Sequence, residues 1–543
     1  MSISPVLLIG LVIIFVLAYP IIKLRNQIFK RKPVEVFHEE MKTSQLRRVL
    51  GKWSLTSLGI GAIIGAGIFV MTGIGAREYA GPALALSFVF AGIGCALAAL
   101  CYAEFASFLP VEGSAYAYSY ATMGEFFAWI IGWDLILEYA MASGAVAVGW
   151  SGYMGKFLNL FDIKLPFWLM HDVFSAKQAL SDSVTNTGVM AELQSHFTQI
   201  SMPTIAGIPF AINLPAFLIV WFVTMILIKG IKEAASTNVI MVAIKVTVVI
   251  FIIIVGAQYI NTANWDPFIP ARASILGPLG DSHMAYGLLG IISGAAYIFF
   301  AYIGFDTVST HAGESINPKK DIPFGIIMSL IVCTILYILV SLVLTGMMNY
   351  KKIDLNAPLA VAFTSVGLKY AVFIISVAAI AGITSVLIVM LLGQSRVFFA
   401  MSKDGLLPKN FFGRLHTKFR TPYKANLLTG TVVSLVAAFT PIHIIAELVN
   451  IGTLLAFVMV CGSVWIMRYR EPNRERPFRT PFINVVAPLG MLFNLGMMLS
   501  LGAHNWERLL FWLALGMAIY FFYGRKHSVM YKLGNGNKEI ENF

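Results

Sequence analysis

Apolar stretches of membrane-spanning length recur along almost the whole chain, and they constrain its fold more than any other feature. A helix needs about 20 apolar residues to cross the hydrocarbon core of a bilayer. About thirteen stretches approach or exceed this length, and they are 3–24, 53–75, 82–109, 126–157, 213–229, 236–259, 285–311, 323–347, 371–402, 424–441, 443–468, 482–501 and 507–524. Because backbone groups in lipid must be hydrogen-bonded within the protein, each stretch is expected to be a helix. The sequence therefore predicts an all-α polytopic membrane protein.

The distribution of basic residues predicts the topology. The chain has 39 lysine and arginine residues against 27 aspartate and glutamate residues, a formal net charge of +12. When alternate loops are assigned to opposite sides with 25–52 inside, 28 of the basic residues fall inside and 9 outside. This is the positive-inside pattern, which also attracts anionic membrane lipid. We therefore expect a multi-pass protein of the plasma membrane (the bacterial inner membrane), with the N-terminus outside, the C-terminus cytoplasmic and no nucleic-acid partner.

The spans and loops divide the chain into six predicted parts. Segment 3–24 has no basic region before it and no convincing small-residue cleavage site, which favours an uncleaved anchor over a signal peptide. A helix lying on the membrane surface is the alternative. The parts are an extra N-terminal transmembrane helix, a cytoplasmic basic segment, a first inverted repeat, a second inverted repeat, two peripheral helices and a cytoplasmic tail, over 1–24, 25–52, 53–259, 260–468, 469–524 and 525–543.

One span is unusually rich in glycine. Residues 59–75 read Gly-Ile-Gly-Ala-Ile-Ile-Gly-Ala-Gly-Ile-Phe-Val-Met-Thr-Gly-Ile-Gly. Glycine costs about 1 kcal/mol in a helix interior, so a plain lipid anchor has no reason to carry so many. Irregular backbone within a membrane is tolerated only where it lines a cavity or is buried in protein. We therefore predict a broken helix with a solute site at mid-membrane; close helix packing through small residues is the alternative.

A second interrupted span occupies a matching place later in the chain. In 285–311, Gly294 and Gly304 flank an aromatic run. Each interrupted span is followed by four more, which gives two five-helix halves that must have opposite topology. Two broken helices at matching positions are the sequence pointer to an inverted-repeat transporter. The prediction is a 5+5 inverted-repeat helix bundle, with two peripheral C-terminal helices and one extra N-terminal helix outside it.

The two breaks predict complementary polar groups. If the backbone unwinds around Gly65-Ala66-Gly67, its free N–H groups start a half-helix whose partial positive charge suits a carboxylate. Carbonyl groups before the first break and along the second can accept from an ammonium. A zwitterion site for an α-amino acid follows. Its candidate backbone and lining residues are Ile63, Ile64, Gly65, Ala66, Gly67, Phe300, Ala301 and Ile303.

Lys245 is an ionisable residue in the middle of the 236–259 span. Such a group is costly in a membrane and is a functional hypothesis by default. It either exchanges a proton during transport or places its ammonium where a sodium ion would bind; structural pairing with a carboxylate is the alternative. Thr384 and Ser385 lie mid-span and either bond back to their own helix or face Lys245.

Other charged residues in the spans have several interpretations. Glu138 is a candidate partner for Lys245 or a group near the substrate, whereas Glu104 lies near a helix end and suits a structural role. Arg396 and Asp306 lie nearer the inner ends of their helices. With a carboxylate such as Glu314, they are candidates for a cytoplasmic gate.

No enzyme constellation emerges. The sequence has no phosphate-binding loop, no nucleophile elbow and no metal-ligand spacing, and its four cysteines all fall in apolar spans. We expect no catalytic residues, no metal and no cofactor. Coupling to ATP within this chain is not expected either.

Several motifs, met in order between about 45 and 525, resemble those of the amino acid–polyamine–organocation (APC) superfamily. The last two look most like the bacterial branch of the cationic amino acid transporter family. The motifs are Gly-Ile-Gly-Ala-Ile-Ile-Gly-Ala-Gly-Ile-Phe (59–69), Tyr-Ala-Glu-Phe (102–105), Pro-Val-Glu-Gly-Ser-Ala-Tyr (110–116), Phe-Phe-Ala-Tyr-Ile-Gly-Phe-Asp (299–306), Asn-Pro-Lys-Lys-Asp-Ile-Pro (317–323) and Gly-Gln-Ser-Arg-Val-Phe-Phe-Ala-Met-Ser-Lys-Asp-Gly-Leu-Leu-Pro (393–408).

The resemblance implies a LeuT-type fold of twelve family helices that works by alternating access. It implies that the substrate carboxylate binds at the amides of Ala66 and Gly67. It implies amine acceptors at the carbonyls of Ile63, Phe300 and Ile303, and a side-chain pocket lined by Ala142 and Met390. Lys245 matches the family lysine that stands in for a sodium site and suggests proton coupling. Two departures are the extra helix 3–24 and Gly313-Glu314, where the family has paired glutamates.

The resulting prediction is a permease for neutral L-amino acids, with the range of side chains left open, and proton symport. Its partners are the amino acid, the proton and membrane lipid. Ala142 and Met390 supply no anionic group for a cationic side chain, but Glu138 would reverse this preference if it pointed into the pocket. A cationic amino acid carrier or an exchanger is the alternative, and a transporter-like amino acid receptor is a more distant one.

Overall fold

The computed structural model describes residues 29–37, 48–111, 113–185, 190, 193–194, 196–230, 235–276 and 282–534. The predicted helix 3–24 lies outside the described residues, as do parts of the predicted segments 25–52 and 525–543. Within the described part, eight helical segments are long and apolar enough to cross a membrane. The chain is therefore a mostly helical, multi-pass membrane protein.

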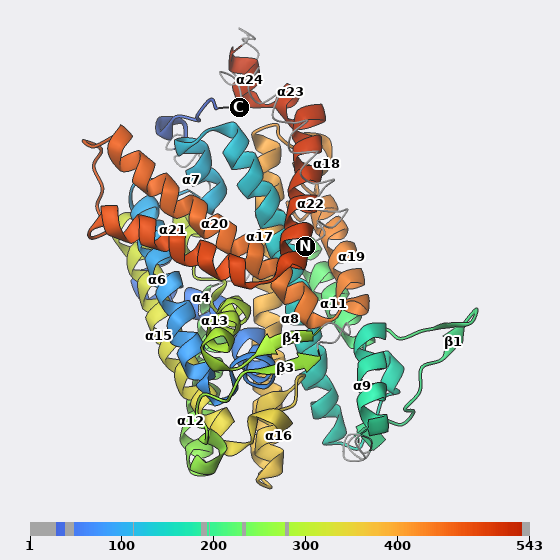
Figure 1. Ribbon diagram of the computed structural model, residues 1–543. Coiled ribbons are helices and arrows are strands. Elements are labelled where there is room, and N and C mark those ends of the chain that lie inside the picture. Colours follow the sequence, from blue (N-terminus) through green and yellow to red (C-terminus); the bar gives the residue numbers. More distant parts are fainter. Residues whose placement is uncertain are drawn as a thin grey trace.

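The predicted spans from 53–75 onward all coincide with helices. Interruptions divide the first and the sixth of these spans into shorter pieces. The uninterrupted spans are α6 Leu84–Phe108, α8 Glu125–Asn159, α11 Leu214–Lys229, α12 Ala235–Ala257, α15 Pro318–Met347, α17 Lys369–Lys403, α19 Tyr423–Phe439, α20 Ile442–Arg470, α21 Ile483–Ser500 and α22 Ala503–Ile519. Figure 1 shows these helices packed along one another, with α9 and the β1 strand projecting from one end.

The interrupted spans consist of several short helices. The first is α4 Lys52–Ile63, the π-helical turn η1 Gly67–Met71, α5 Thr72–Gly75 and the π-helical turn η2 Ala76–Ala80. The second is α13 Gly287–Ile298, the 3₁₀ turn η6 Phe299–Tyr302 and α14 Thr307–Thr310. Both interruptions fall where glycine lowers the cost of leaving the helix.

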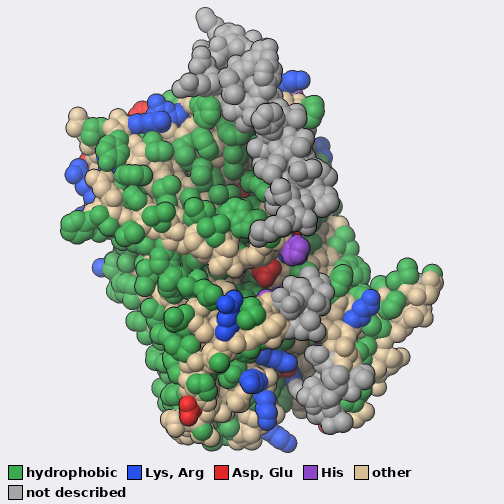
Figure 2. All heavy atoms as spheres, viewed as in Figure 1, with side chains coloured by type: hydrophobic (Ala, Val, Ile, Leu, Met, Phe, Trp, Pro, Cys, Tyr) green, Lys and Arg blue, Asp and Glu red, His purple; other side chains and the backbone are tan. Residues whose placement is uncertain are grey.

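Burial separates the central helices from the lipid-facing ones. In an apolar window of 18 residues, 94% of the residues of α8 are buried inside the protein, whereas only 33% of those of α12 are buried. On α12, large apolar side chains such as Ile240 and Ile254 are exposed, as expected for a surface that lipid covers. Figure 2 shows hydrophobic side chains over most of the visible flank and lysine and arginine near its two ends. Helix α8 therefore forms the centre of the bundle.

Helices from the two halves of the chain pack in corresponding pairs. Helix α6 packs on α15, α8 on α17 and α11 on α19, and the interrupted spans meet where η1 contacts η6. The helices of these pairs are, in order, the second, third and fourth spans of each predicted five-helix half. This pairing positions the two interruptions face to face in the interior.

Several smaller elements fall in loops, where their short length gives no span signal. They are α7 Ser114–Thr122, α9 Val173–Thr185, α16 Pro358–Ser365, α18 Lys409–Phe412, α23 Arg525–His527, α24 Val529–Gly534, and the 3₁₀ turns Phe167–Leu169, Thr262–Trp265, Ala312–Glu314 and Tyr350–Lys352. The 3₁₀ turn Gly81–Ala83 leads directly into α6, and the π-helical turn Tyr520–Gly524 continues α22. Two antiparallel hairpins pair β1 Thr204–Ile205 with β2 Ile208–Pro209, and β3 Ala273–Leu276 with β4 Ser282–Ala285.

Candidate functional site

The first interruption lies between α4 and η1. Helix α4 ends at Ile63, Ile64 is extended with φ −73° and ψ 100°, and helical geometry resumes at Ala66. The last carbonyls of α4 and the first amides of the following half-helix have no partner along a continuous helix. The predicted break around Gly65 is thus present, and it creates a half-helix N-terminus with partial positive charge.

The second interruption follows η6. Ile303 is extended, with φ −60° and ψ 133°, and Gly304 has φ +121°, a conformation that side-chain-bearing residues rarely adopt. The chain then turns into α14. Sequence reasoning identified Gly304 as part of a break, and its positive φ supplies the physical reason.

The two interruptions touch through glycine. A methyl group at Gly67 would lie 2.4 Å from Cα of Ala301, and one at Gly304 would lie 2.9 Å from the carbonyl carbon of Ala62. Both approaches are closer than real Cβ contacts allow. Two backbones therefore cross at distances that only glycine permits.

A small cavity lies beside this crossing. Its volume is about 10 Å³ for the centre of a water-sized sphere, which is room for about one water molecule. The site is therefore closed around this cavity in the present conformation. The cavity is lined by Ala62, Ile63, Gly65, Ala66, Gly67, Ala142, Val146, Phe300, Ile303, Val386 and Met390.

Most of the candidate binding residues meet at this cavity. The predicted residues that line it are Ile63, Gly65, Ala66, Gly67, Ala142, Phe300, Ile303 and Met390. Ile64 and Ala301 are buried but are not among its lining residues; Ala301 packs against Gly67. Val146 and Val386 are lining residues that the sequence did not single out, since nothing distinguishes a valine in one apolar span from another.

Tyr337 joins the two interruptions. Its hydroxyl lies 2.8 Å from the carbonyl oxygen of Ile63 and 2.9 Å from that of Ala301, and it donates to both in a shared hydrogen bond. The side chain comes from α15 and is fully buried. Sequence reasoning missed it, because a tyrosine in an apolar span carries no signal of which backbone its hydroxyl reaches.

Lys245 contacts the first interrupted span from α12. Its Nζ donates to the carbonyl oxygen of Gly61 at 2.9 Å. Its aliphatic part packs against Gly382 of α17, where an added methyl group would lie 3.2 Å from Cγ and Cε of Lys245. The structure therefore places this buried amine on the backbone of α4, two residues before Ile63. The pairing with Glu138 considered above is not observed among the described residues.

Thr384 and Ser385 of α17 do not bond to Lys245 in the described structure. Thr384 donates to the carbonyl of Ile380 at 2.7 Å and accepts from the indole of Trp150 at 2.9 Å. Ser385 is buried, one residue further along the helix. The back-bonding alternative therefore applies to Thr384.

Glu138 is buried one helical turn from Ala142 but does not line the cavity. Its Oε2 has no hydrogen-bond partner among the described residues, and it shares its surroundings with Asp306 and Asp134. A carboxyl group in this place cannot pair with a charged substrate side chain in the cavity as it stands. In the part of the chain that the structure describes, no charged side chain therefore lines the small cavity.

The helix ends that the sequence predicts to be cytoplasmic carry two ion-pair systems. Nη2 of Arg396 lies 3.6 Å from Oε1 of Glu314, the pair considered above for a cytoplasmic gate. Glu104 is fully buried and pairs with Arg468 at 2.6 Å and Arg476 at 3.2 Å. This arrangement agrees with the structural role expected for Glu104.

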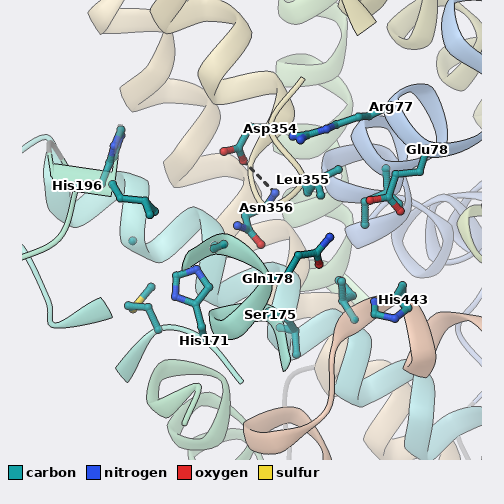
Figure 3. A pocket seen from close by; sticks show the side chains of 18 of the residues that line it. Arg77, Glu78, His171, Ser175, Gln178, His196, Asp354, Leu355, Asn356 and His443 are labelled. Carbon is teal, nitrogen blue, oxygen red and sulfur yellow. Dashed lines mark hydrogen bonds between the residues drawn. The ribbon is translucent and has the colours of Figure 1, made fainter. Parts of the chain in front are cut away.

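A larger cavity of about 600 Å³ for the centre of a water-sized sphere lies toward the other end. Figure 3 shows several of its polar side chains; Glu78 comes from the first interrupted span, His171 from the residues just before α9, and Asp354 from the loop before α16. Burial lowers the pKa of His171 in spite of its bond to the Phe167 carbonyl, so this histidine is neutral at pH 7. No lining residue is shared with the small cavity, so described residues separate the two.

Comparisons with known proteins agree with this architecture. The amino acid permease family matches residues 50–523. A methylthioribose transporter of Bacillus subtilis (strain 168) is 42% identical over 507 residues, which cover 93% of this chain and 100% of the relative. Branched-chain amino acid permease BcaP of the same organism is 43% identical over 507 residues, covering 93% and 99%. Cationic amino acid transporter 4, vacuolar, of Arabidopsis thaliana is 35% identical over 450 residues, covering 82% and 68%.

Proposed function

The chain belongs to the amino acid permease family of the APC superfamily, and from this premise we propose that it imports neutral L-amino acids by proton symport. Family members of this kind are transporters and not enzymes, so the predictions of a permease and of no catalytic activity are confirmed. The substrate within the family, and the coupling ion, belong to the proposal.

The observation that carries the proposal is the polar backbone around the small cavity. The amides that begin the half-helix at Ala66 and Gly67 suit a carboxylate. The carbonyl group of Ile63 before the first break, and those of Phe300 and Ile303 on the second interrupted span, suit an ammonium. A site with one donor end and one acceptor end complements a zwitterion, which supports an α-amino acid as the substrate.

The apolar side of the cavity supports a neutral substrate side chain. Ala142, Val146, Val386 and Met390 present no charge, and Glu138 lies outside the lining. A cationic side chain would bury its charge there without a partner, which is costly. This reasoning favours neutral amino acids over the cationic substrates named for the plant relative.

Lys245 supports proton coupling. A fully buried amine that contacts one uncharged carbonyl, that of Gly61, is costly when charged. Gain and loss of a proton at Lys245 would change its hydrogen bond to the Gly61 carbonyl, and this bond holds α4 next to the proposed substrate site. Proton symport therefore has a physical link to the site through a single hydrogen bond.

The packing of corresponding helices supports a 5+5 inverted repeat over 53–259 and 260–468. An inverted repeat relates the two halves by a two-fold axis in the membrane plane. The observed pairs α6 with α15, α8 with α17 and α11 with α19 are those that such an axis would bring together. The basic-residue bias favours a cytoplasmic position for the end with Arg396 and Arg468.

Methylthioribose is a second candidate substrate, because a relative named for its transport matches 93% of this chain. A thiosugar lacks the carboxylate and the ammonium that the backbone groups complement. The geometry therefore favours the amino acid, and competition between the two substrates distinguishes the candidates.

The test is uptake of radiolabelled alanine, leucine, arginine and methylthioribose into proteoliposomes, with and without an inward proton gradient. The proposal expects gradient-stimulated uptake of neutral amino acids that does not depend on sodium. Uptake that requires internal substrate and no gradient would identify an exchanger. Saturable binding without uptake would identify a receptor, and uptake of arginine alone would contradict the neutral pocket.

A further inference from the structure

A second large cavity lies where α8 begins and α20 ends, and it shares no described lining residue with the proposed amino acid site. It has a volume of about 1050 Å³ for the centre of a water-sized sphere, as large as cavities that hold small ligands. Its walls come from the segment before the first interrupted span, from the start of α8 and from the end of α20. We call it the basic groove, and it is lined by Phe29, Lys30, Arg31, Lys32, Pro33, Val34, Glu35, Ala121, Met123, Phe127, Ile466, Arg470, Glu471 and Arg474.

Positive charge exceeds negative charge in the basic groove. Two of its basic side chains have acidic partners: Lys32 donates to Asp404 at 3.0 Å, and Arg474 pairs with Glu471 and Glu35. The remaining basic side chains, Lys30, Arg31 and Arg470, are exposed at its rim. These three cations from two distant parts of the sequence therefore face a shared opening.

The backbone that carries these cations is fixed to the bundle. The amide of Lys32 donates to the carbonyl of Tyr120 at 3.3 Å, and the amide of Glu125 donates to the carbonyl of Lys30 at 3.0 Å. A methyl group at Gly124 would lie 2.6 Å from the backbone of Phe29, so the two chains are in close contact. The guanidinium of Arg470 is held by the carbonyl of Thr122 at 2.8 Å. The backbone that carries Lys30 and Arg31, and the guanidinium of Arg470, are thus placed in advance of any ligand.

The groove also lies at the ends of two helices of membrane-spanning length, the level at which lipid headgroups are expected. Helix α8 begins at Glu125 and α20 ends at Arg470, so the groove is where two membrane spans meet the aqueous phase. Partly exposed apolar side chains, Phe127 and Ile466, form its membrane-side wall. Cations above an apolar wall at this level match a phosphate attached to acyl chains.

We propose that the basic groove binds the headgroup of an anionic membrane phospholipid, with Lys30, Arg31 and Arg470 contacting its phosphate. Arginine can bind phosphate through two parallel hydrogen bonds, and lysine adds a point charge. Such a lipid would join the segment around Lys30 to the ends of α8 and α20. This inference is independent of the transported substrate.

The test measures thermal unfolding of the full chain in a neutral detergent with added phosphatidylglycerol, phosphatidylcholine or inorganic phosphate. We expect phosphatidylglycerol alone to raise the unfolding midpoint of the wild type. The variant K30Q/R31Q/R470Q should lose most of that shift. The matched control R414Q/K418Q/R420Q removes the same charge from exposed residues of another inner loop and should keep it.

Each other outcome overturns the proposal. An equal shift with inorganic phosphate would indicate a free-anion site, and an equal shift with phosphatidylcholine would indicate a general lipid effect. Equal behaviour of the groove variant and the control variant would place the lipid elsewhere. If K30Q/R31Q/R470Q does not fold, K30Q/R31Q keeps the Arg470 contact with Thr122, and it should still lose at least half of the shift.

Discussion

The two interrupted helices use glycine for different purposes. At the first interruption, Gly67 has ordinary helical geometry and is needed because Ala301 lies too close for any side chain. At the second, Gly304 is needed both for its φ of +121° and for its contact with Ala62. In the proposed site, the first break would supply amide donors beside a close backbone approach, and the second would supply carbonyl acceptors beside an unusual backbone turn. The comparison teaches that one site can be built from two breaks with separate physical requirements.

The largest expected effect comes from Gly304→Ala. Alanine at this φ is strained by about 1–3 kcal/mol, and its methyl group would press on the Ala62 backbone. Because both requirements fail together, we expect uptake to fall to background in proteoliposomes. Gly502→Ala, at φ +78° with open space around it, is the control and should keep near-normal uptake. Normal uptake by Gly304→Ala would contradict the role assigned to the second break.

Lys245→Met tests an asymmetry between the two breaks, because the amine contacts the first interrupted span through Gly61. Methionine fills similar space and cannot gain or lose a proton. We expect acid stimulation of uptake to disappear, measured as the ratio of initial rates at pH 5.5 and pH 7.5. Unchanged acid stimulation would remove the lysine from the coupling mechanism.

Tyr337→Phe breaks the link between the interruptions while leaving each intact. Losing the hydrogen bond shared by Ile63 and Ala301 should cost about 1–2 kcal/mol, or about 10-fold in apparent substrate affinity. The matched control is Tyr302→Phe, whose hydroxyl donates to the Phe88 carbonyl. Concentration-dependent uptake measures both, and equal effects would show that the bridge has no special role.

The smallest expected effect concerns the loop that packs on the outer part of the first interrupted span. Burial opposes ionisation of Asp354, but Lys156 and the amides of Ala357 and Asn356 outweigh it and lower the pKa of Asp354 below its usual 3.8. The carboxylate therefore stabilises the fold above that pH, and this stability is lost as pH falls through the lowered pKa.

Accordingly, Asp354→Asn should destabilise the protein at pH 7 by about 1 kcal/mol or less. The difference from the wild type should shrink below about pH 3.8, and unfolding midpoints across the pH range provide the measurement. Glu475→Gln, at an exposed position, is the control. A difference that grows on acidification would show that the Asp354 carboxylate does not stabilise the fold in this way.

Much of this architecture could be predicted from the sequence because it rests on local composition. A run of apolar residues fixes a membrane helix whatever surrounds it, and clustered glycine weakens a helix where it occurs. The spans from 53–75 onward and the breaks near Gly65 and Gly304 follow from these effects. Most of the candidate cavity residues follow as well, since they flank the breaks in the chain.

Other features depend on which helices pack together, and the tertiary structure alone decided them. The partner of Lys245 is the Gly61 carbonyl and not Glu138, and Tyr337 reaches both breaks from α15. Neither contact has a local signal, because in an apolar span each side chain could face lipid or any neighbouring helix. The sequence by itself determined a membrane protein with two broken helices. Packing decided that the two breaks cross so closely that a methyl group at Gly67 would lie 2.4 Å from Cα of Ala301, and that a small cavity lies beside this crossing.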